Sequence, residues 1–96
     1  MTKVLVRSGD SSSDVEILSD SDFISTALSQ IGTISTNLKE CNETDVLIHG
    51  MADIMELMQE VLIKSNIAPA LVLEQALALR EQEGSFQDKK AVTKEQ

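Results

Sequence analysis

Apolar residues recur at three- and four-residue steps in three separate segments of the chain, which is the spacing of one face of an α-helix. The pattern predicts helices over residues 22–38, 45–65 and 69–83. In the first segment the opposite face carries Ser, Thr and Gln side chains, which are polar but uncharged. The apolar stripe of that segment consists of Ile24, Ala27, Leu28, Ile31, Ile34 and Leu38. The pattern therefore predicts an all-α protein with three main helices.

Residues with capping chemistry bound the three segments. Ser19 opens a capping box before the first helix, and Thr44 is a suitable N-cap for the second. Asn66 suits the end of the second helix, Pro69 suits the first turn of the third, and Gly84 suits a left-handed cap at its end. The cap residues thus predict the same helix ends as the hydrophobic spacing.

The chain of 96 residues is expected to form a single domain. Residues 1–18 predict an extended arm followed by a turn, and the polar residues 87–96 predict a flexible tail. The second helix is apolar over a wider face than packing against one helix requires, so neighbours on several sides, including a second chain, are expected. We therefore expect an antiparallel helical bundle that assembles as a homodimer or a dimer of dimers.

The charge of the chain excludes some classes of partner. Sixteen Asp and Glu against eight Lys and Arg give a formal net charge of −8. Nucleic acids and anionic membrane surfaces are bound through basic faces, so neither is an expected partner. No segment has the apolar run of a signal peptide or a membrane span, and Cys41 is the single cysteine, which favours a soluble cytoplasmic protein.

Several short motifs together resemble the MazG-like proteins, relatives of phosphoribosyl-ATP pyrophosphohydrolase. Val4–Arg7 is similar to the opening of one branch of that superfamily, and Ile17–Phe23 resembles the segment before its first long helix. Met51–Leu57 resembles the core of its second helix, Ile67–Pro69 follows at the expected distance, and Leu79–Phe86 resembles its closing element. The resemblance covers most of the chain in order and spacing.

The resemblance implies a nucleotide pyrophosphohydrolase that holds Mg²⁺ between a Glu-x-x-Glu pair on the first helix and a Glu-x-x-Asp pair on the second. Carboxylates three residues apart share a helix face, and an oxygen-rich box of this kind suits Mg²⁺. The corresponding positions in this chain are Ile31 and Ile34 on the first helix and Gly50 and Asp53 on the second. Only Asp53 keeps a carboxylate. The sequence therefore predicts a chain without a catalytic site, with no metal and with no cofactor.

We expect the remaining function to be binding or scaffolding, with a nucleotide-like small molecule as a possible ligand of the cleft between the helices. An active pyrophosphohydrolase that uses relocated acids is the alternative, with Mg²⁺ at Asp53 and Glu56, supplemented by Glu60 and by Glu40 or Glu43. A small helical protein-interaction module without any link to nucleotides is a second alternative. The expected cleft residues are Gln30, Ile31, Ile34, Gly50, Asp53 and Glu56, with Arg80 as the nearest phosphate partner.

Three of these positions allow two interpretations each. Asp53 is either a ligand-binding residue or a partly solvated carboxylate that pairs with a basic group. His49 and Asp53, four residues apart, either orient a base or stabilise the helix. Gly50 either allows a close approach of the two helices or leaves room for a ligand, and Gly32 could face it across a close helix contact.

Overall fold

The computed structural model describes residues 3–10 and 14–94, and in this part of the chain it contains three α-helices and no strand. They are α1 (Asp20–Leu38), α2 (Thr44–Lys64) and α3 (Pro69–Glu83). The predicted all-α class is confirmed, and each predicted helix end lies within two residues of the observed one. The predicted arm and tail extend to residues 1–2, 11–13 and 95–96, which lie outside the described residues.

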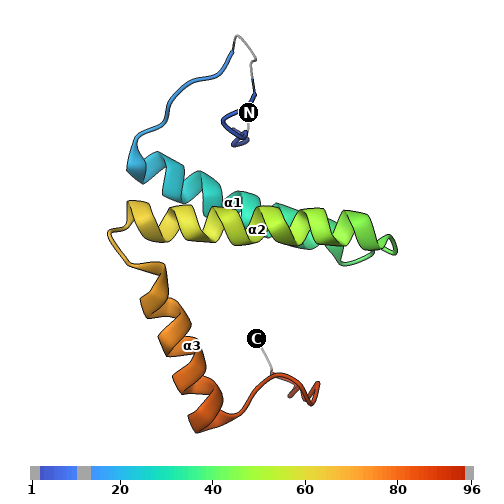
Figure 1. Cartoon of the computed structure of the whole chain (residues 1–96). Helices are drawn as coiled ribbons and strands as arrows, with labels where there is room; N and C mark the ends of the chain where they lie inside the picture. Colours follow the sequence, from blue (N-terminus) through green and yellow to red (C-terminus); the bar gives the residue numbers. More distant parts are fainter. Residues whose placement is uncertain (1–2, 11–13, 95–96) are drawn as a thin grey trace.

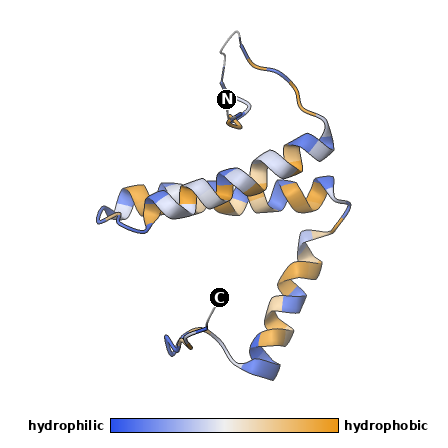
Figure 2. Ribbon diagram, turned by 180° about the vertical axis from the view of Figure 1, so that it is seen from behind, coloured by the Kyte–Doolittle hydropathy of each residue, from blue (hydrophilic) through white to orange (hydrophobic). Residues whose placement is uncertain are grey.

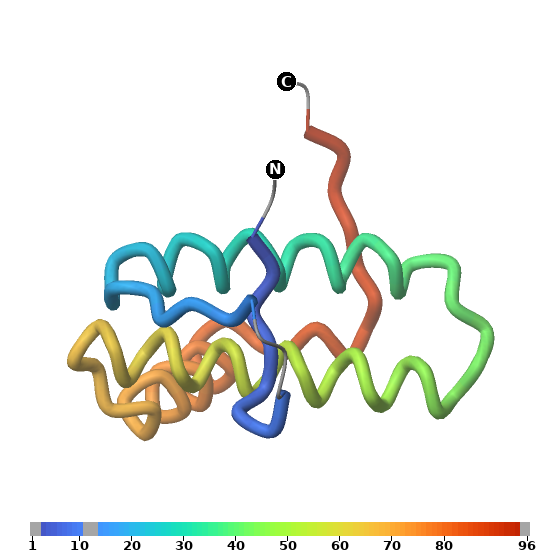
Figure 3. Tube along the Cα trace, turned by 90° about the horizontal axis from the view of Figure 1, so that it is seen from above, coloured from blue at the N-terminus to red at the C-terminus, as the bar shows by residue number. Residues whose placement is uncertain are grey.

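The first two helices form an antiparallel hairpin and lie side by side along most of their length (Figures 1 and 3). Their shared core is small. Ala27 of α1 is fully buried and is the one buried hydrophobic residue in the described part of the chain, and Gly50 of α2 is also buried. Ile31 and Ile34 are half-buried on the same side of α1 as Ala27. The apolar stripe of α1 therefore packs on α2, as its spacing predicts.

The start of α1 follows its predicted capping chemistry. The Ser19 hydroxyl accepts a hydrogen bond from the Asp22 N–H, and two aspartates lie in the first turn, where the helix dipole favours negative charge. On the outer face, hydroxyl groups donate to the carbonyl four residues earlier, as Thr33 does to Ser29 and Ser35 does to Ile31. Thr36 makes the same bond to the Gly32 carbonyl, so these three hydroxyls are satisfied within the helix itself.

The start of α2 differs from the sequence prediction. Thr44 is the first residue of the helix, and Glu43 is its N-cap, with an extended backbone and no capping bond from its side chain. The Glu43 carbonyl accepts the first helical hydrogen bond, from the Leu47 N–H. The predicted N-cap role of Thr44 is therefore wrong by one residue, because the turn after α1 places the last extended residue at position 43.

The turn between α2 and α3 fixes the direction in which the third helix leaves the hairpin. Asn66 has a positive φ of 61°, the Ile67 N–H donates to the Leu62 carbonyl, and the Asn66 N–H donates to the Ile63 carbonyl. This pair of bonds is a Schellman motif, which ends a helix and turns the chain away from it. Pro69 then begins α3 and Gly84 ends it, as predicted, but Gly84 has φ 87° and ψ 178°, which is not the left-handed helical conformation that was expected.

Helix α3 does not complete a bundle within the chain. It meets α2 beside their connecting turn, has no contact with α1, and extends away from the hairpin (Figure 1). Apolar residues predominate in its first three turns, and its last turn is polar (Figure 2). The expected packing of helices into an antiparallel bundle is therefore realised, within one chain, only by α1 and α2. None of the described helices has the length and hydropathy needed to span a membrane.

Candidate functional site

The N-terminal arm crosses over the α1–α2 hairpin and is tied to α1 by one side chain. The Gln30 amide oxygen accepts from the Leu5 N–H at 2.7 Å, and its amide nitrogen donates to the Leu5 carbonyl at 3.2 Å. A glutamine amide carries one acceptor and one donor in the same plane, so it pairs with both backbone groups of one residue, as a neighbouring strand would. Figure 3 shows the arm lying across both helices.

The arm is tied to α2 by a charged contact. Arg7 donates from Nη2 to Asp53 Oδ1 at 2.5 Å and from Nη1 to Glu56 Oε1 at 2.7 Å. Asp53 and Glu56 are three residues apart on α2 and share a face, so one planar guanidinium reaches both carboxylates. The hydrogen bonds that Arg7 donates, first to Asp53 and then to Glu56, raise the pKa of Arg7 above its ordinary value.

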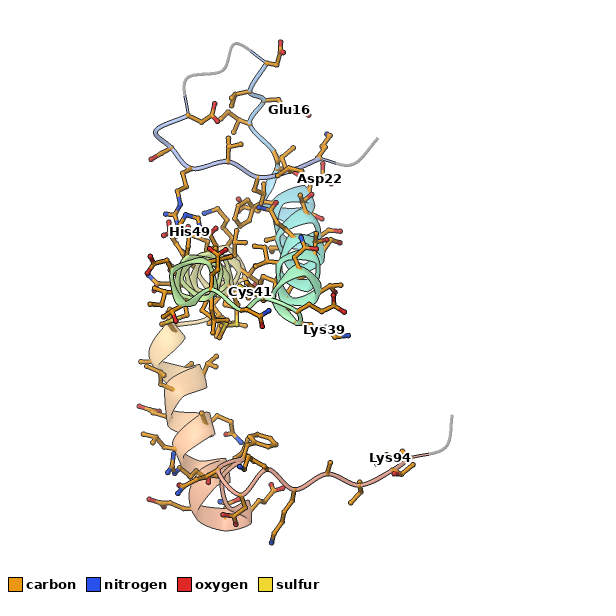
Figure 4. All side chains as sticks on the ribbon, turned by 90° about the vertical axis from the view of Figure 1, so that its right-hand side faces the viewer. Glu16, Asp22, Lys39, Cys41, His49 and Lys94 are labelled. Atoms are coloured by element: carbon orange, nitrogen blue, oxygen red, sulfur yellow. The ribbon has the colours of Figure 1, made fainter. Side chains whose placement is uncertain are left out.

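His49 lies on the side of α2 that faces the arm (Figure 4). Its Nδ1 is 3.5 Å from Asp53 Oδ2, and its side chain is 77% exposed. Asp53 thus has one oxygen on Arg7 and the other beside His49. The contact to His49 is longer and more exposed than the contact to Arg7. It supports the helix-stabilising interpretation of this i, i+4 pair more than an oriented catalytic base.

The arm and the hairpin enclose an open groove of about 740 Å³. Three of the predicted cleft residues, Gln30, Asp53 and Glu56, line this groove. The arm forms much of one wall of the groove. This wall includes Arg7, which was not among the predicted cleft residues. The carboxylates along the groove belong to Asp10, Asp53, Glu56 and Glu60. The groove is therefore acidic, and its basic group, Arg7, is already engaged by two carboxylates.

The other predicted cleft residues lie elsewhere. Ile34 and Gly50 line a shallower hollow near the α1–α2 turn. Asp53 lines both this hollow and the main groove. Ile31 lines neither hollow and is half-buried on the side of α1 that packs on α2. Arg80 lies in the last turn of α3, which extends away from the hairpin (Figure 1), so it is not placed to bind a phosphate in the groove.

Gly50 allows a close contact between the two helices. A Cβ at this position would lie 2.8 Å from Leu38 Cδ1 and 2.9 Å from Leu38 Cδ2. The space that a side chain would need is therefore filled by Leu38, and the close-packing interpretation of Gly50 is supported over room for a ligand. The proposed facing glycine is wrong, because Gly32 is exposed and a Cβ there would meet no atom within 4 Å.

The acidic residues do not gather into a metal site. In the part of the chain that the structure describes, no group of three or more His, Cys, Asp or Glu side chains is placed to hold one ion. Glu60 pairs with Lys64 at 2.8 Å instead. Glu43 precedes the first residue of α2, so the rise of an α-helix places it roughly 15 Å along the axis from Asp53.

The residues that sequence reasoning missed are Leu5 and Arg7. Their contacts join positions 25 to 49 residues apart, which no periodic pattern reports. One signal was present, because Arg7 is the last basic residue before Lys39 and is followed by several acidic residues. A cation in this position is a natural partner for carboxylates elsewhere in the chain.

Comparison of the chain with protein-family models, with curated proteins and with solved structures found no match.

Proposed function

We propose that this chain is a non-catalytic helical scaffold that acts as a homo-oligomer. The observation that carries the proposal is the exposure of α3. Leu71, Leu73 and Leu77 are 58%, 67% and 64% exposed, and Val72 and Leu79 are 46% and 41% exposed. A helix that is apolar around its circumference is normally buried between neighbours. Within the chain, α3 has such contact only beside its connecting turn.

The energetics of a lone helix support the same conclusion. Isolated helices shorter than about 12–15 residues are marginal in water, because nucleation is costly and packing supplies most of their stability. Helix α3 has 15 residues and no intrachain packing surface along its length. The hairpin also buries little, with Ala27 as its buried hydrophobic residue in the described part. Association of chains would supply the burial that one chain lacks.

The site favours a scaffold over the metal-dependent hydrolase that the MazG-like resemblance implies. Two of the four positions that would carry ligands, Ile31 and Ile34, are apolar and half-buried on the side of α1 that packs on α2. A third is Gly50, which Leu38 covers. The fourth, Asp53, is bound to Arg7 together with Glu56. In this proposal the resemblance extends to the order of the segments and not to the reaction.

Sedimentation equilibrium across roughly 1–200 µM protein tests the proposal. We expect a mass of at least twice 10.5 kDa at the upper concentrations. Circular dichroism at 222 nm should fall on dilution as chains separate and α3 loses its packing. Leu77→Glu should shift association by at least tenfold toward the single chain, because it places a charge on an apolar surface that is buried on assembly.

Gln82→Glu is the matched control, since it adds the same charge to the polar last turn of α3. It should associate like the original chain. A single-chain mass at every concentration, with helicity independent of dilution, would contradict the proposal.

A further inference from the structure

Helix α2 has a second apolar face, directed away from α1. Ile48, Met51, Met55 and Met58 recur at steps of three and four residues and are 61%, 49%, 66% and 46% exposed. We call these four residues the methionine face. At 100° per residue it lies about 130° around the helix from the side that contains Gly50 and Leu57. The arm covers a different side, through Asp53 and Glu56. The methionine face is uncharged, and no element in the described part of the chain covers it.

The accessible surface of the chain is large for its mass. It amounts to 8584 Å², whereas a compact chain of 10.5 kDa exposes roughly 5,400 Å². The radius of gyration is 16.3 Å, against about 12–13 Å for a compact domain of this length. A standard interface removes about 800 Å² from each partner. The surplus of about 3,000 Å² exceeds that amount even if half of it belongs to the arm and tail.

The turn after α2 keeps α3 from covering the methionine face of its own chain. Asn66 in the left-handed region and the two Schellman hydrogen bonds direct the chain away from α2. Asn66, Ile67 and Ala68 lead from this turn directly into Pro69, and α3 extends away from the hairpin (Figure 1). The methionine face and α3 are thus two exposed apolar surfaces in one chain that do not reach each other.

We propose that two copies of this chain exchange α3, so that α3 of each copy lies on the methionine face of the partner's α2. This inference rests on the homo-oligomeric function proposed above and adds the geometry of its interface. A two-fold axis closes both contacts at once, because each copy offers one helix and one face. The lengths agree, since α3 spans about 22 Å and the methionine face about 15 Å.

The exchange also accounts for the small polar share of the first three turns of α3, in which Glu74 and Gln75 are the polar residues. A single neighbouring helix covers only one stripe of α3. It would leave in water either the pair Leu71 and Val72 or the pair Leu73 and Leu77, because the two pairs lie on different sides of α3. In the exchanged dimer the two α3 helices also meet near the two-fold axis, so each is covered by the partner's α2 and by the partner's α3. The result is a four-helix core made from two copies of α2 and α3. Methionine suits such a seam, because its flexible side chain fills irregular gaps.

Disulfide trapping between differently tagged chains tests the exchange. Both chains carry Cys41→Ser, one adds Met55→Cys on α2 and the other adds Leu73→Cys on α3. After the chains are mixed and oxidised, the covalent heterodimer should form at least fivefold more than with His49→Cys in place of Met55→Cys. His49 is exposed and lies about 120° around α2 from Met55, on the side that faces the arm, so it serves as the control.

A measurement on the unmodified chain guards against a variant that does not fold. In a mixed sample with methyl-labelled Met in one copy and methyl-labelled Leu in the other, isotope-filtered NMR should show contacts from Met51, Met55 or Met58 to the leucines of α3. Oligomers that show only α3–α3 contacts, or equal trapping at His49, would overturn the exchange and leave the oligomeric scaffold standing. A single-chain mass at all concentrations would overturn both.

Discussion

The side chain of Gln30 holds the backbone of Leu5 by two hydrogen bonds, one accepted and one donated. The contact is partly buried and joins the arm to the middle of α1. It replaces the ladder that an extended segment would form with a second strand, although the described part of the chain contains no strand. The position of the arm thus depends on one side chain of α1 and one charged contact with α2.

Gln30→Ala should release the arm from α1. Each of the two hydrogen bonds is worth about 0.5–1.5 kcal/mol, so the free energy of opening the arm should fall by roughly 1–3 kcal/mol. Amide hydrogen exchange at Leu5 measures this directly. Ser25→Ala, on the exposed face of the same helix, is the control and should leave the exchange rate of Leu5 unchanged. Unchanged protection of Leu5 in Gln30→Ala would show that the amide does not hold the arm.

Arg7→Lys should loosen the arm while the net charge stays the same. The planar guanidinium reaches Asp53 and Glu56 together, whereas an ammonium group is a point charge without this fork. Exchange of the arm amides should therefore become severalfold faster, and added salt should have the same effect on the original chain. Lys3→Arg is the control, because Lys3 pairs with Glu16 within the arm and not with the helices.

Arg7 should keep its charge in this contact between pH 7 and pH 10. Because the hydrogen bonds to Asp53 and Glu56 raise the pKa of Arg7 in the folded chain, its contribution is fully present below its unfolded pKa. That contribution is lost only as pH rises through the raised folded pKa, which is far above neutrality. Titration of Arg7 should therefore not change the amide hydrogen exchange of the arm between pH 7 and pH 10, once the exchange rates are corrected for their intrinsic pH dependence. A transition attributable to Arg7 in that interval would contradict this contact.

Two glycines should respond in opposite directions to the same change. Gly32→Ala should stabilise the chain by about 0.8–1 kcal/mol, because the site is open and alanine favours the helix. Gly50→Ala gains the same propensity but places a Cβ 2.8 Å from Leu38 Cδ1. Overpacking costs about 1–3 kcal/mol, so Gly50→Ala should be destabilising by about 1 kcal/mol. Urea unfolding of both variants measures the difference.

A third variant isolates the clash. In a Leu38→Ala background, Gly50→Ala should lose its penalty, and the double-mutant cycle should give a coupling of at least about 0.5 kcal/mol. No coupling would mean that Leu38 does not occupy the space beside Gly50.

The sequence predicts the helices and their ends, but it does not predict the contacts between residues that are far apart in the chain. The ends of α3 follow from Pro69, Gly84 and the apolar spacing, since each acts on its own neighbours. The contacts of Leu5 with Gln30 and of Arg7 with Asp53 depend on how a non-periodic arm crosses the hairpin, which local propensities do not encode. The separation of Arg80 from the groove could not be predicted from the sequence either, because it depends on the direction in which the turn at Asn66 sends α3.

Magnesium and nucleotides provide the test that separates the scaffold from the relocated-acid enzyme. Asp53 and Glu56 share Arg7, and Glu60 pairs with Lys64, so the acidic groove offers no free pair of carboxylates for a cation on α2. Its acidity also opposes a triphosphate. Millimolar Mg²⁺ with a panel of nucleoside triphosphates should therefore release no pyrophosphate and should move the melting temperature by less than about 1 °C, since a ligand that does not bind the folded chain does not stabilise it. Asp53→Asn and Glu56→Gln are the decisive variants, because release that required Mg²⁺ and disappeared in both would establish the enzyme in place of the scaffold.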